Sequence, residues 1–372
     1  MLIKNIILKK YRNYDNLNLT FNDKLNIFIG DNAQGKTNIL ESIYVLSLTK
    51  SYLGVSDRDL IKFNNSNCII EGKIYKDDFL NDLEIKITQN SKKIFINSKE
   101  IKKFRDYISK FNVILFSPEN IRMIKEGPSL RRKFLNIEIS QINNKYVSKM
   151  NDFNYILKQR NELLKNDSIN KIYFDVINDK YIDLSIYIYR EREKFLNKIN
   201  EYINSIYYDI SLEEGLRISY ICDFNLEKND LELKEEFLKK LNDSFDREKK
   251  YGISLYGPHR DDFRFFLNDR DVSIYGSQGQ MRMSVLSLKL SEINVFKDYT
   301  NDYPILLLDD IFSELDIIKR NNLIKYFSYN IQTIITTTDL NMIDKSLLDN
   351  AFIFNINNGN VLKKENDNYG GK

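Results

Sequence analysis

The chain opens with short apolar runs separated by polar turns, a pattern that predicts β-strands. These runs cover residues 3–8, 17–21 and 25–29, then 68–74, 83–88 and 93–96, and finally 113–116. An apolar run with helical spacing, residues 38–46, follows the third strand. Pro118 comes directly after the last run and would end a strand, because proline lacks the N–H donor that a sheet requires.

After Pro118 the spacing of the apolar residues lengthens to between three and five, which predicts amphipathic helices. One such run extends from residue 129 to 165, where the polar stretch Asn166-Asp167-Ser168 breaks it. A second run follows through residues 184–206. Two long helices joined by a short turn pack antiparallel, so we expect an inserted helical arm.

Strands and helices alternate again in the last part of the chain. We expect strands at 216–221, 305–308 and 331–337, a hairpin whose turn is Asn268-Asp269, and helices at 231–250, 277–295 and 317–328. The predicted fold class is α/β, a single head domain interrupted by an antiparallel helical arm. The predicted parts are residues 1–118 for the first half of the head, 119–250 for the arm, and 251–372 for the second half of the head.

The composition limits the cellular location and the kinds of chemistry that we expect for the protein. No stretch is long and apolar enough to span a bilayer, and the first residues lack the apolar core of a signal peptide, so we expect a cytoplasmic protein without a membrane partner. Cys68 and Cys222 lie far apart in sequence and lack the spacing of a metal site, so we interpret them as two thiols in the core. The single histidine, His259, argues against histidine-based zinc or triad chemistry.

The net charge of +3 is small, but it is unevenly distributed. Residues 119–165 contain ten Lys/Arg against five Asp/Glu, and the run is densest at Arg131-Arg132-Lys133. Such runs usually form a solvated helix face. Contacts to DNA phosphates are the alternative, and these three residues are the candidates for them.

One motif carries specific chemistry. The run Gly30-Asp31-Asn32-Ala33-Gln34-Gly35-Lys36-Thr37, followed by Asn38, matches the pattern G-x-x-x-x-G-K-[ST] between a predicted strand and a predicted helix. The two glycines let backbone N–H groups converge on a phosphate. Lys36, read as an exposed loop lysine, would reach the β- and γ-phosphates, and the Thr37 hydroxyl would hold Mg²⁺. The sequence therefore predicts a site for ATP and Mg²⁺.

A second apolar strand, residues 304–308, ends in Asp309 and Asp310. A carboxylate at the tip of a strand beside the phosphate-binding loop is expected to bind magnesium together with Thr37, and Asp309 has that place. Asp310 is one residue further on, where a general base would orient the attacking water. Lys36, Asp309 and Asp310 are thus the predicted catalytic residues, with a solvated acidic turn as the alternative for the two aspartates.

A third feature is the turn Ser277-Gln278-Gly279-Gln280, which opens a predicted helix and so forms a second anion site. The chain has one predicted nucleotide site, so it provides no second nucleotide for this turn to bind. We therefore expect it to cap ATP that is bound by another copy of the chain, which predicts an ATP-dependent homodimer.

Taken together, these motifs closely resemble those of the RecF family, bacterial recombination mediators in the SMC-like branch of the ABC ATPases. The resemblance covers the whole length, and the runs that carry it are residues 10–14, 30–38, 117–135, 257–263, 277–280 and 306–316. It implies an ABC-type ATPase head in which residues 277–280 act as a signature motif in trans. It also implies a weak, DNA-stimulated ATPase that binds double-stranded, gapped or junction DNA and helps RecO and RecR to load RecA.

Two places depart from what the resemblance implies. Tyr52-Leu53-Gly54 stand near the position where the family commonly has a His-Arg-Thr stretch, so the resemblance does not carry over a nucleotide contact from that arginine. Asp310 is typical of the family but is shorter than the glutamate of the wider ABC class, which suits slow hydrolysis. Arg12 and Glu119 are weaker candidates for nucleotide contacts, with an exposed strand-end arginine and a simple helix-start glutamate as the alternatives. Residues 336–339 follow a predicted strand beside the site and are a weaker candidate for sensing the γ-phosphate.

The same spacings also bear on two other function classes. A transporter subunit would place its signature motif much closer to the phosphate-binding loop. An SMC-like chromosome-organising protein or structural DNA clamp is the nearer alternative, but it would need a far longer helical arm.

Overall fold

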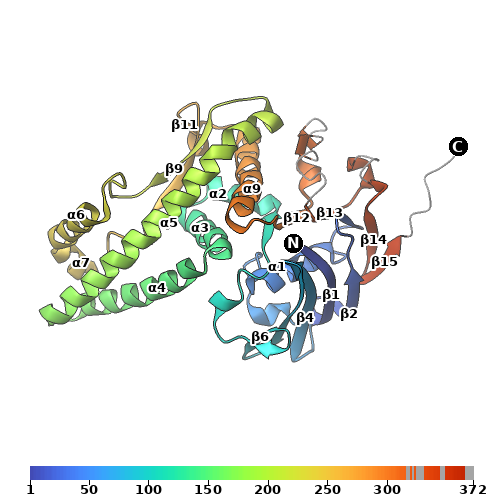
Figure 1. Ribbon diagram of the computed structural model, residues 1–372, viewed down its shortest axis with the longest axis horizontal. Helices are drawn as coiled ribbons and strands as arrows, with labels where there is room; N and C mark the ends of the chain where they lie inside the picture. Colours follow the sequence, from blue (N-terminus) through green and yellow to red (C-terminus); the bar gives the residue numbers. More distant parts are fainter. Residues whose placement is uncertain (316–318, 321, 324–330, 344–347, 365–372) are drawn as a thin grey trace. The chain divides into compact units, whose positions relative to one another are not determined.

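The computed structural model describes residues 1–372 except 316–318, 321, 324–330, 344–347 and 365–372 (Figure 1). The chain forms two compact units. Unit 1 comprises Met1–Asn120, Asp209–Leu212 and Lys289–Lys372, and unit 2 comprises Ile121–Tyr208 and Glu213–Leu288.

The first sheet of unit 1 is antiparallel, in the order β2-β1-β4-β5-β6-β7. Its strands are β1 (Leu2–Tyr11), β2 (Tyr14–Thr20), β4 (Asn67–Lys76), β5 (Phe79–Thr88), β6 (Lys92–Ile96) and β7 (Lys99–Glu100). Alternate residues along β4 and β5 are buried, as expected for strands with one face on the core. The predicted meander is confirmed, with β4, β5 and β6 paired in sequence order.

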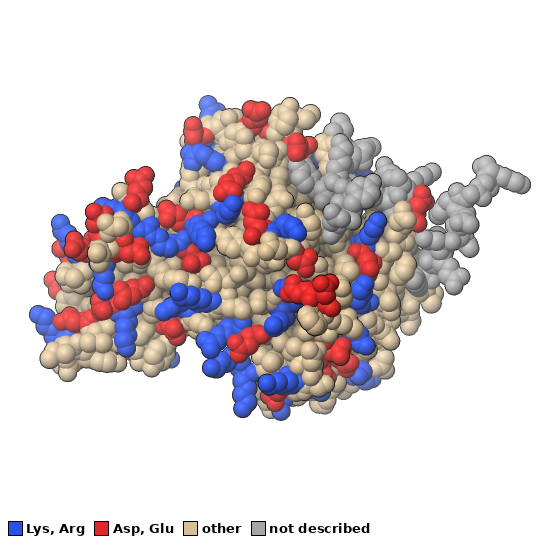
Figure 2. All heavy atoms as spheres, in the orientation of Figure 1, with Lys and Arg blue, Asp and Glu red and all other residues tan. Residues whose placement is uncertain are grey.

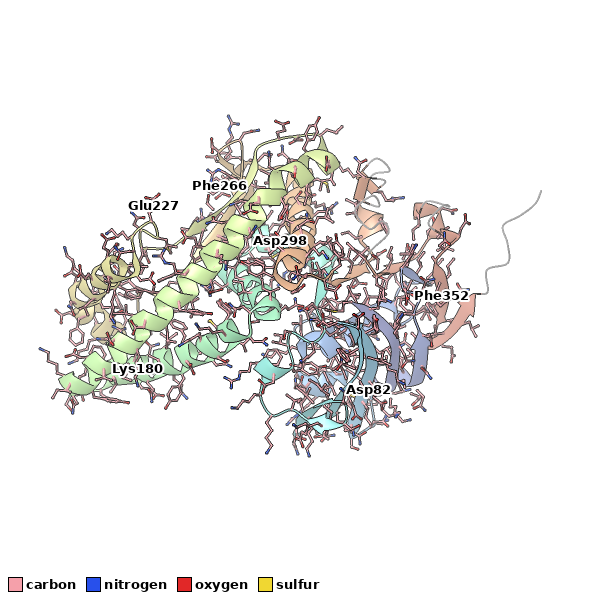
Figure 3. All side chains as sticks on the ribbon, in the orientation of Figure 1. Asp82, Lys180, Glu227, Phe266, Asp298 and Phe352 are labelled. Atoms are coloured by element: carbon pink, nitrogen blue, oxygen red, sulfur yellow. The ribbon has the colours of Figure 1, made fainter. Side chains whose placement is uncertain are left out.

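The second sheet of unit 1 has the order β15-β14-β3-β13-β12-β8 and is mostly parallel. Its strands are β3 (Leu25–Ile29), β8 (Val113–Phe116), β12 (Ile305–Asp309), β13 (Thr333–Thr337), β14 (Phe352–Asn357) and β15 (Asn360–Lys364). Phe352, labelled in Figure 3, is the first residue of β14, which lies beside β3. Helix α1 (Lys36–Leu48) contacts strands of both sheets and is buried on nearly every side, so it forms the middle layer of the unit.

Unit 2 contains most of the helices. They are α2 (Arg122–Lys125), α3 (Pro128–Ile142), α4 (Asn144–Lys165), α5 (Lys171–Ser211), α6 (Asp230–Asp243), α7 (Phe245–Tyr251), α8 (Val272–Tyr275) and α9 (Gln278–Thr300), of which α5 and α9 continue into unit 1. Helices α4 and α5 are antiparallel, since Phe153 stacks on Tyr181 while Arg160, later in α4, hydrogen-bonds Asn178, earlier in α5. The predicted helical arm is confirmed, and Figure 1 shows its two long helices side by side.

The arm differs from the prediction in detail. The run 129–165 is two helices, because Asn143 is extended and its side chain accepts the N–H groups of Lys145 and Tyr146 as the N-cap of α4. The predicted helix 231–250 likewise ends and restarts at Ser244. The second arm helix begins at Lys171, well before the predicted start at 184.

A small antiparallel sheet, β11-β10-β9, completes unit 2. Its strands are β9 (Leu216–Ile221), β10 (Asp262–Leu267) and β11 (Arg270–Asp271). Because β10 pairs along its whole length with β9, the predicted boundary at residue 250 falls inside unit 2. Most of the predicted helix 317–328 lies outside the described residues.

Short 3-10 helices connect these elements at η1 (Asp57–Leu60), η2 (Phe104–Asp106), η3 (Pro118–Ile121), η4 (Ile311–Glu314) and η5 (Leu340–Met342). Over the residues that the structure describes, no helix combines the length and the apolar composition needed to cross a bilayer.

Candidate nucleotide site

The loop between β3 and α1 is tightly packed where its two glycines lie. Gly35 has φ +114°, and a Cβ added there would lie 2.5 Å from Asn13 Nδ2 and 2.7 Å from the Tyr14 hydroxyl. A Cβ on Gly30 would lie 2.3 Å from the carbonyl oxygen of Ile356. Both positions therefore require glycine for packing, and not only for access to a phosphate.

Neighbouring strands fix the course of this loop. Asn13 Nδ2 donates to the carbonyl of Gln34 (3.2 Å), and the buried Tyr14 hydroxyl donates to the carbonyl of Gly35 (3.0 Å). The Gln34 side chain accepts the N–H of Asn358 (2.6 Å), in the turn between β14 and β15. Gln34 thus ties the loop to a distant hairpin, and Asn38 adds a bond from its Nδ2 to Asn13 Oδ1 (2.9 Å).

Lys36 is the first residue of α1 and is only 6% exposed, so the expectation of an exposed loop lysine is wrong. Its Nζ donates to the carbonyls of Gly30 (2.6 Å) and Asp31 (2.7 Å). Burial lowers the pKa of Lys36, and the carboxylates of Asp310 and Asp309 act in the opposite direction. The ammonium group is therefore held directly over the loop, facing the acidic end of β12.

Asp309 is the last residue of β12 and is 8% exposed. The Thr37 hydroxyl donates to its Oδ1 (3.0 Å), although the two residues are 272 positions apart. A hydroxyl and a carboxylate side by side are oxygen ligands of the kind Mg²⁺ prefers, and few protein ligands are needed when phosphates complete the shell. The donor set at Thr37 and Asp309 therefore fits the predicted ion.

Two further hydroxyl groups hold the same carboxylate. Thr336, at the end of β13, lies 2.8 Å from Asp309 Oδ1, and the Tyr52 hydroxyl donates to Oδ2 (2.9 Å). Burial, and then the charge of Asp309, raise the pKa of Tyr52 well above its usual value, so it remains a donor. Sequence reasoning named Tyr52 only as a departure from a family pattern, since nothing local ties it to Asp309.

Asp310 lies at a sharp turn of the backbone. Its φ is +48°, in the left-handed region, and its N–H donates to the Thr336 hydroxyl (3.0 Å). Thr336 therefore holds the Asp309 carboxylate and the backbone N–H of Asp310 at the end of β12. The sequence suggested residues 336–339 as candidates beside the site, and Thr336 is the member that lies there.

Arg12 is held by a buried carboxylate on α1. Its guanidinium pairs with Glu41 (2.6 Å), which is fully buried and also accepts the Tyr11 hydroxyl (2.9 Å). Next to this pair lies a hollow of about 810 Å³ whose lining includes Arg12, Asn13, Asn38, Arg58, Asp59 and Ile61. Asn13 and Asn38 line this hollow and hydrogen-bond each other, and Asn13 also bonds Gln34, so the hollow lies next to the phosphate-binding loop.

The second predicted anion site lies at the start of α9, in unit 2. Ser277, Gln278 and Gly279 are exposed, and Gln280 is partly so. Ser277 and Gln280 form a reciprocal cap: the Ser277 N–H donates to Gln280 Oε1 (3.0 Å), and the Gln280 N–H donates to Ser277 Oγ (3.2 Å). A Cβ on Gly279 would meet only Ser277 Oγ, at 3.8 Å, so the surface of this turn is open.

The three predicted DNA contacts have different surroundings. Arg131 is 7% exposed, and its Nε and Nη2 bond the two oxygens of Asp262 at 2.6 and 2.9 Å. This corrects the prediction for Arg131, which is a buried structural residue. Arg132 is half-buried and donates to the carbonyl of Asp261 (2.7 Å), whereas Lys133 is exposed.

Comparison with known proteins agrees with this geometry. The family model described as the RecF/RecN/SMC N terminal domain matches residues 2–361. A DNA replication and repair protein RecF of Clostridium botulinum is 41% identical over 97% of this chain and 100% of its own length. One of Listeria monocytogenes is 38% identical over 98% of this chain and 100% of its own length. A solved structure of the recombination mediator protein RecF with ATP superposes with a TM-score of 0.90 at 32% identity, covering 98% of both chains.

Proposed function

We propose that this chain, which belongs to the RecF family of DNA replication and repair proteins and has an ABC-type ATPase head, acts as an ATP-dependent recombination mediator. In this proposal ATP binding drives dimerisation, the dimer binds gapped or junction DNA, and it assists the loading of RecA together with RecO and RecR. Hydrolysis is weak and is stimulated by DNA.

One observation supports the ATPase activity above all others. Thr37 and Asp309 are 272 positions apart and meet at 3.0 Å, and the charges of Asp310 and Asp309 act on Lys36 beside them. A triphosphate over the loop would receive the backbone N–H groups at the start of α1, and Lys36 would exchange its two carbonyl partners for phosphate oxygens. The hollow beside Arg12 and Asn13 is large enough for the nucleoside.

The chemical step follows from the end of β12. Thr37 and Asp309 would hold Mg²⁺, which neutralises the charge that develops on the phosphates. Asp310 takes the proton of the attacking water and fixes its direction. The bonds from Thr336 and Tyr52 keep the Asp309 carboxylate in one orientation before the nucleotide arrives.

Dimerisation depends on the open turn at the start of α9. The N-terminus of this 23-residue helix carries partial positive charge, and Ser277 and Gly279 leave its surface accessible. In a two-fold dimer each turn would face the triphosphate held by the other copy. ATP would then stabilise only the paired state and shift the equilibrium toward it.

The dimer is tested by Ser277→Arg, which places a bulky cation on the turn. Sedimentation with ATP and Mg²⁺ is expected to show a monomer that still binds ATP, with weakened binding to gapped DNA. Ser168→Arg is the matched control, since Ser168 is exposed in the turn between α4 and α5. Dimerisation of the Ser277→Arg variant at the wild-type ATP concentration contradicts the role in trans.

A further inference from the structure

Residues 92–110 form a second basic run, in unit 1. They include seven Lys/Arg against two Asp/Glu, a net charge of +5, whereas the whole chain carries +3. The run covers β6, β7 and η2. Figure 2 shows Lys and Arg side chains gathered over β6 and the segment that follows it.

Most of these cations face solvent. The side chains of Lys93, Lys99, Lys102, Lys103 and Lys110 are exposed. We call these five residues the β6–β7 lysine surface. Within the described part of the chain, Lys99, Lys102 and Lys103 have no carboxylate at ion-pair distance. This contrasts with Arg131, whose charge is neutralised inside unit 2 by Asp262.

The backbone under this surface is firmly anchored. Asn97, in the turn between β6 and β7, exchanges two bonds of 2.8 Å with Asp82 of β5, a residue labelled in Figure 3. After β7, Tyr107 and Phe111 are at most 1% exposed, and the Tyr107 hydroxyl donates to the carbonyl of Leu46 in α1. The lysines therefore project from a fixed support, which reduces the entropy lost on binding.

Their arrangement has a cost within the sheet. Lys93 lies directly opposite Lys86 across β5 and β6, and like charges in that position are destabilising. Edge lysines also protect a sheet from pairing with other chains, which is a sufficient reason for some of them. Negatively charged side chains would protect the edge as well, so protection does not explain why these residues are positive. The positive sign is therefore the feature that indicates an anionic ligand.

We propose that the β6–β7 lysine surface binds the phosphate backbone of duplex DNA. The inference rests on the proposed DNA-binding function and adds to it a surface in unit 1. Duplex is favoured over single-stranded DNA because proteins that hold single strands combine a basic groove with exposed aromatic rings on which the bases stack, and residues 92–110 present no fully exposed ring. Here Phe95 and Phe104 are half-buried, and Lys86 Nζ covers the Phe95 ring at 4.8 Å. Binding would follow charge and not base sequence.

The test is a triple variant, Lys99→Glu with Lys102→Glu and Lys103→Glu, which reverses the sign and retains a charged edge. Binding to a fluorescent duplex of arbitrary sequence is measured by anisotropy over a salt series. Loss of three phosphate contacts is expected to reduce the slope of log K against log salt by about 2.7, and the affinity near 0.1 M salt on the order of 10²-fold. The control carries the same charge change on α6 and α7, at Lys239, Lys249 and Lys250, which are exposed in unit 2.

The outcomes separate this inference from the proposed function. Weakened duplex binding in the first variant alone, with unchanged ATP affinity, supports the surface. Equal weakening in the control variant shows an effect of net charge and overturns the proposed surface. The surface is also overturned if the wild-type protein binds duplex DNA and the first variant binds it with the same affinity. Absence of DNA binding by the wild-type protein overturns the surface and the DNA-binding function together. If the glutamate variant does not fold, the same three Lys→Gln changes replace it.

Discussion

Replacing Arg131 by glutamine distinguishes a structural arginine from a DNA contact. In unit 2 its guanidinium bonds both oxygens of Asp262, and both side chains are about a tenth exposed, at 9% and 10%. Its Nη1 also donates to the carbonyls of Met123 (2.5 Å) and Glu126 (2.8 Å). Glutamine cannot replace these four bonds, so the Asp262 carboxylate would be left buried without its main partner.

The magnitude follows from that carboxylate. Breaking a buried pair by removing one partner costs about 3–5 kcal/mol. Asp262 keeps the N–H of Phe263 (2.9 Å) and gains some compensation from Arg264 at 3.6 Å, which is half-exposed. The lower end, about 3 kcal/mol, is therefore expected for the loss in unfolding free energy. Urea unfolding followed by circular dichroism measures it.

Lys133→Gln is the matched control, because Lys133 is exposed on the same helix. Its effect on stability is expected to stay within about 0.5 kcal/mol. A paired change, Arg131→Met with Asp262→Leu, is expected to recover most of the loss, because it removes both charges together. The reasoning is refuted if Arg131→Gln unfolds like the wild-type protein and yet loses affinity for DNA.

Two other predictions concern titratable groups. Asp310→Asn is expected to retain ATP binding but nearly stop single-turnover hydrolysis, because an amide does not accept the proton of the water, whereas Asp309→Asn should weaken Mg²⁺-dependent binding. Identical defects in the two variants would contradict these roles. For His259, burial lowers the pKa to about 4, with the charge of Arg260 acting in the same direction. The unfolded chain takes up that proton near pH 6.5, so stability is complete above 6.5 and falls by about 3 kcal/mol as the pH drops toward 4. The imidazole signal of this single histidine should not titrate between pH 8 and 5, and a midpoint near 6.5 would show the reasoning to be wrong.

The features that the sequence predicted are those encoded by neighbouring residues. The phosphate-binding loop, the strands of the meander and the long arm helices each follow from local spacing and turn chemistry. Thr37 and Asp309 could be matched across 272 positions because each belongs to a recognisable motif, but contacts between distant residues outside such motifs could not be predicted. Tyr52 meets Asp309 across 257 positions, and Arg131 meets Asp262 across 131. A run of basic residues does not indicate which of them point inward, and the break at Asn143 depends on one side chain acting as a cap.

The hydrogen bond between Gln34 and Asn358 affects when the phosphate-binding loop can form during protein synthesis. The two residues are 324 positions apart, and β3 pairs with β13 and β14, which are made late. At about 5–20 residues per second, the ribosome needs roughly 15–65 s to make the intervening chain. Once residue 96 has been made, the meander is complete in sequence, whereas β3 still has neither of its neighbours and the phosphate-binding loop has no hairpin to hold it. We therefore expect the nucleotide site to assemble only after β13, β14 and the hairpin that holds Gln34 have been made.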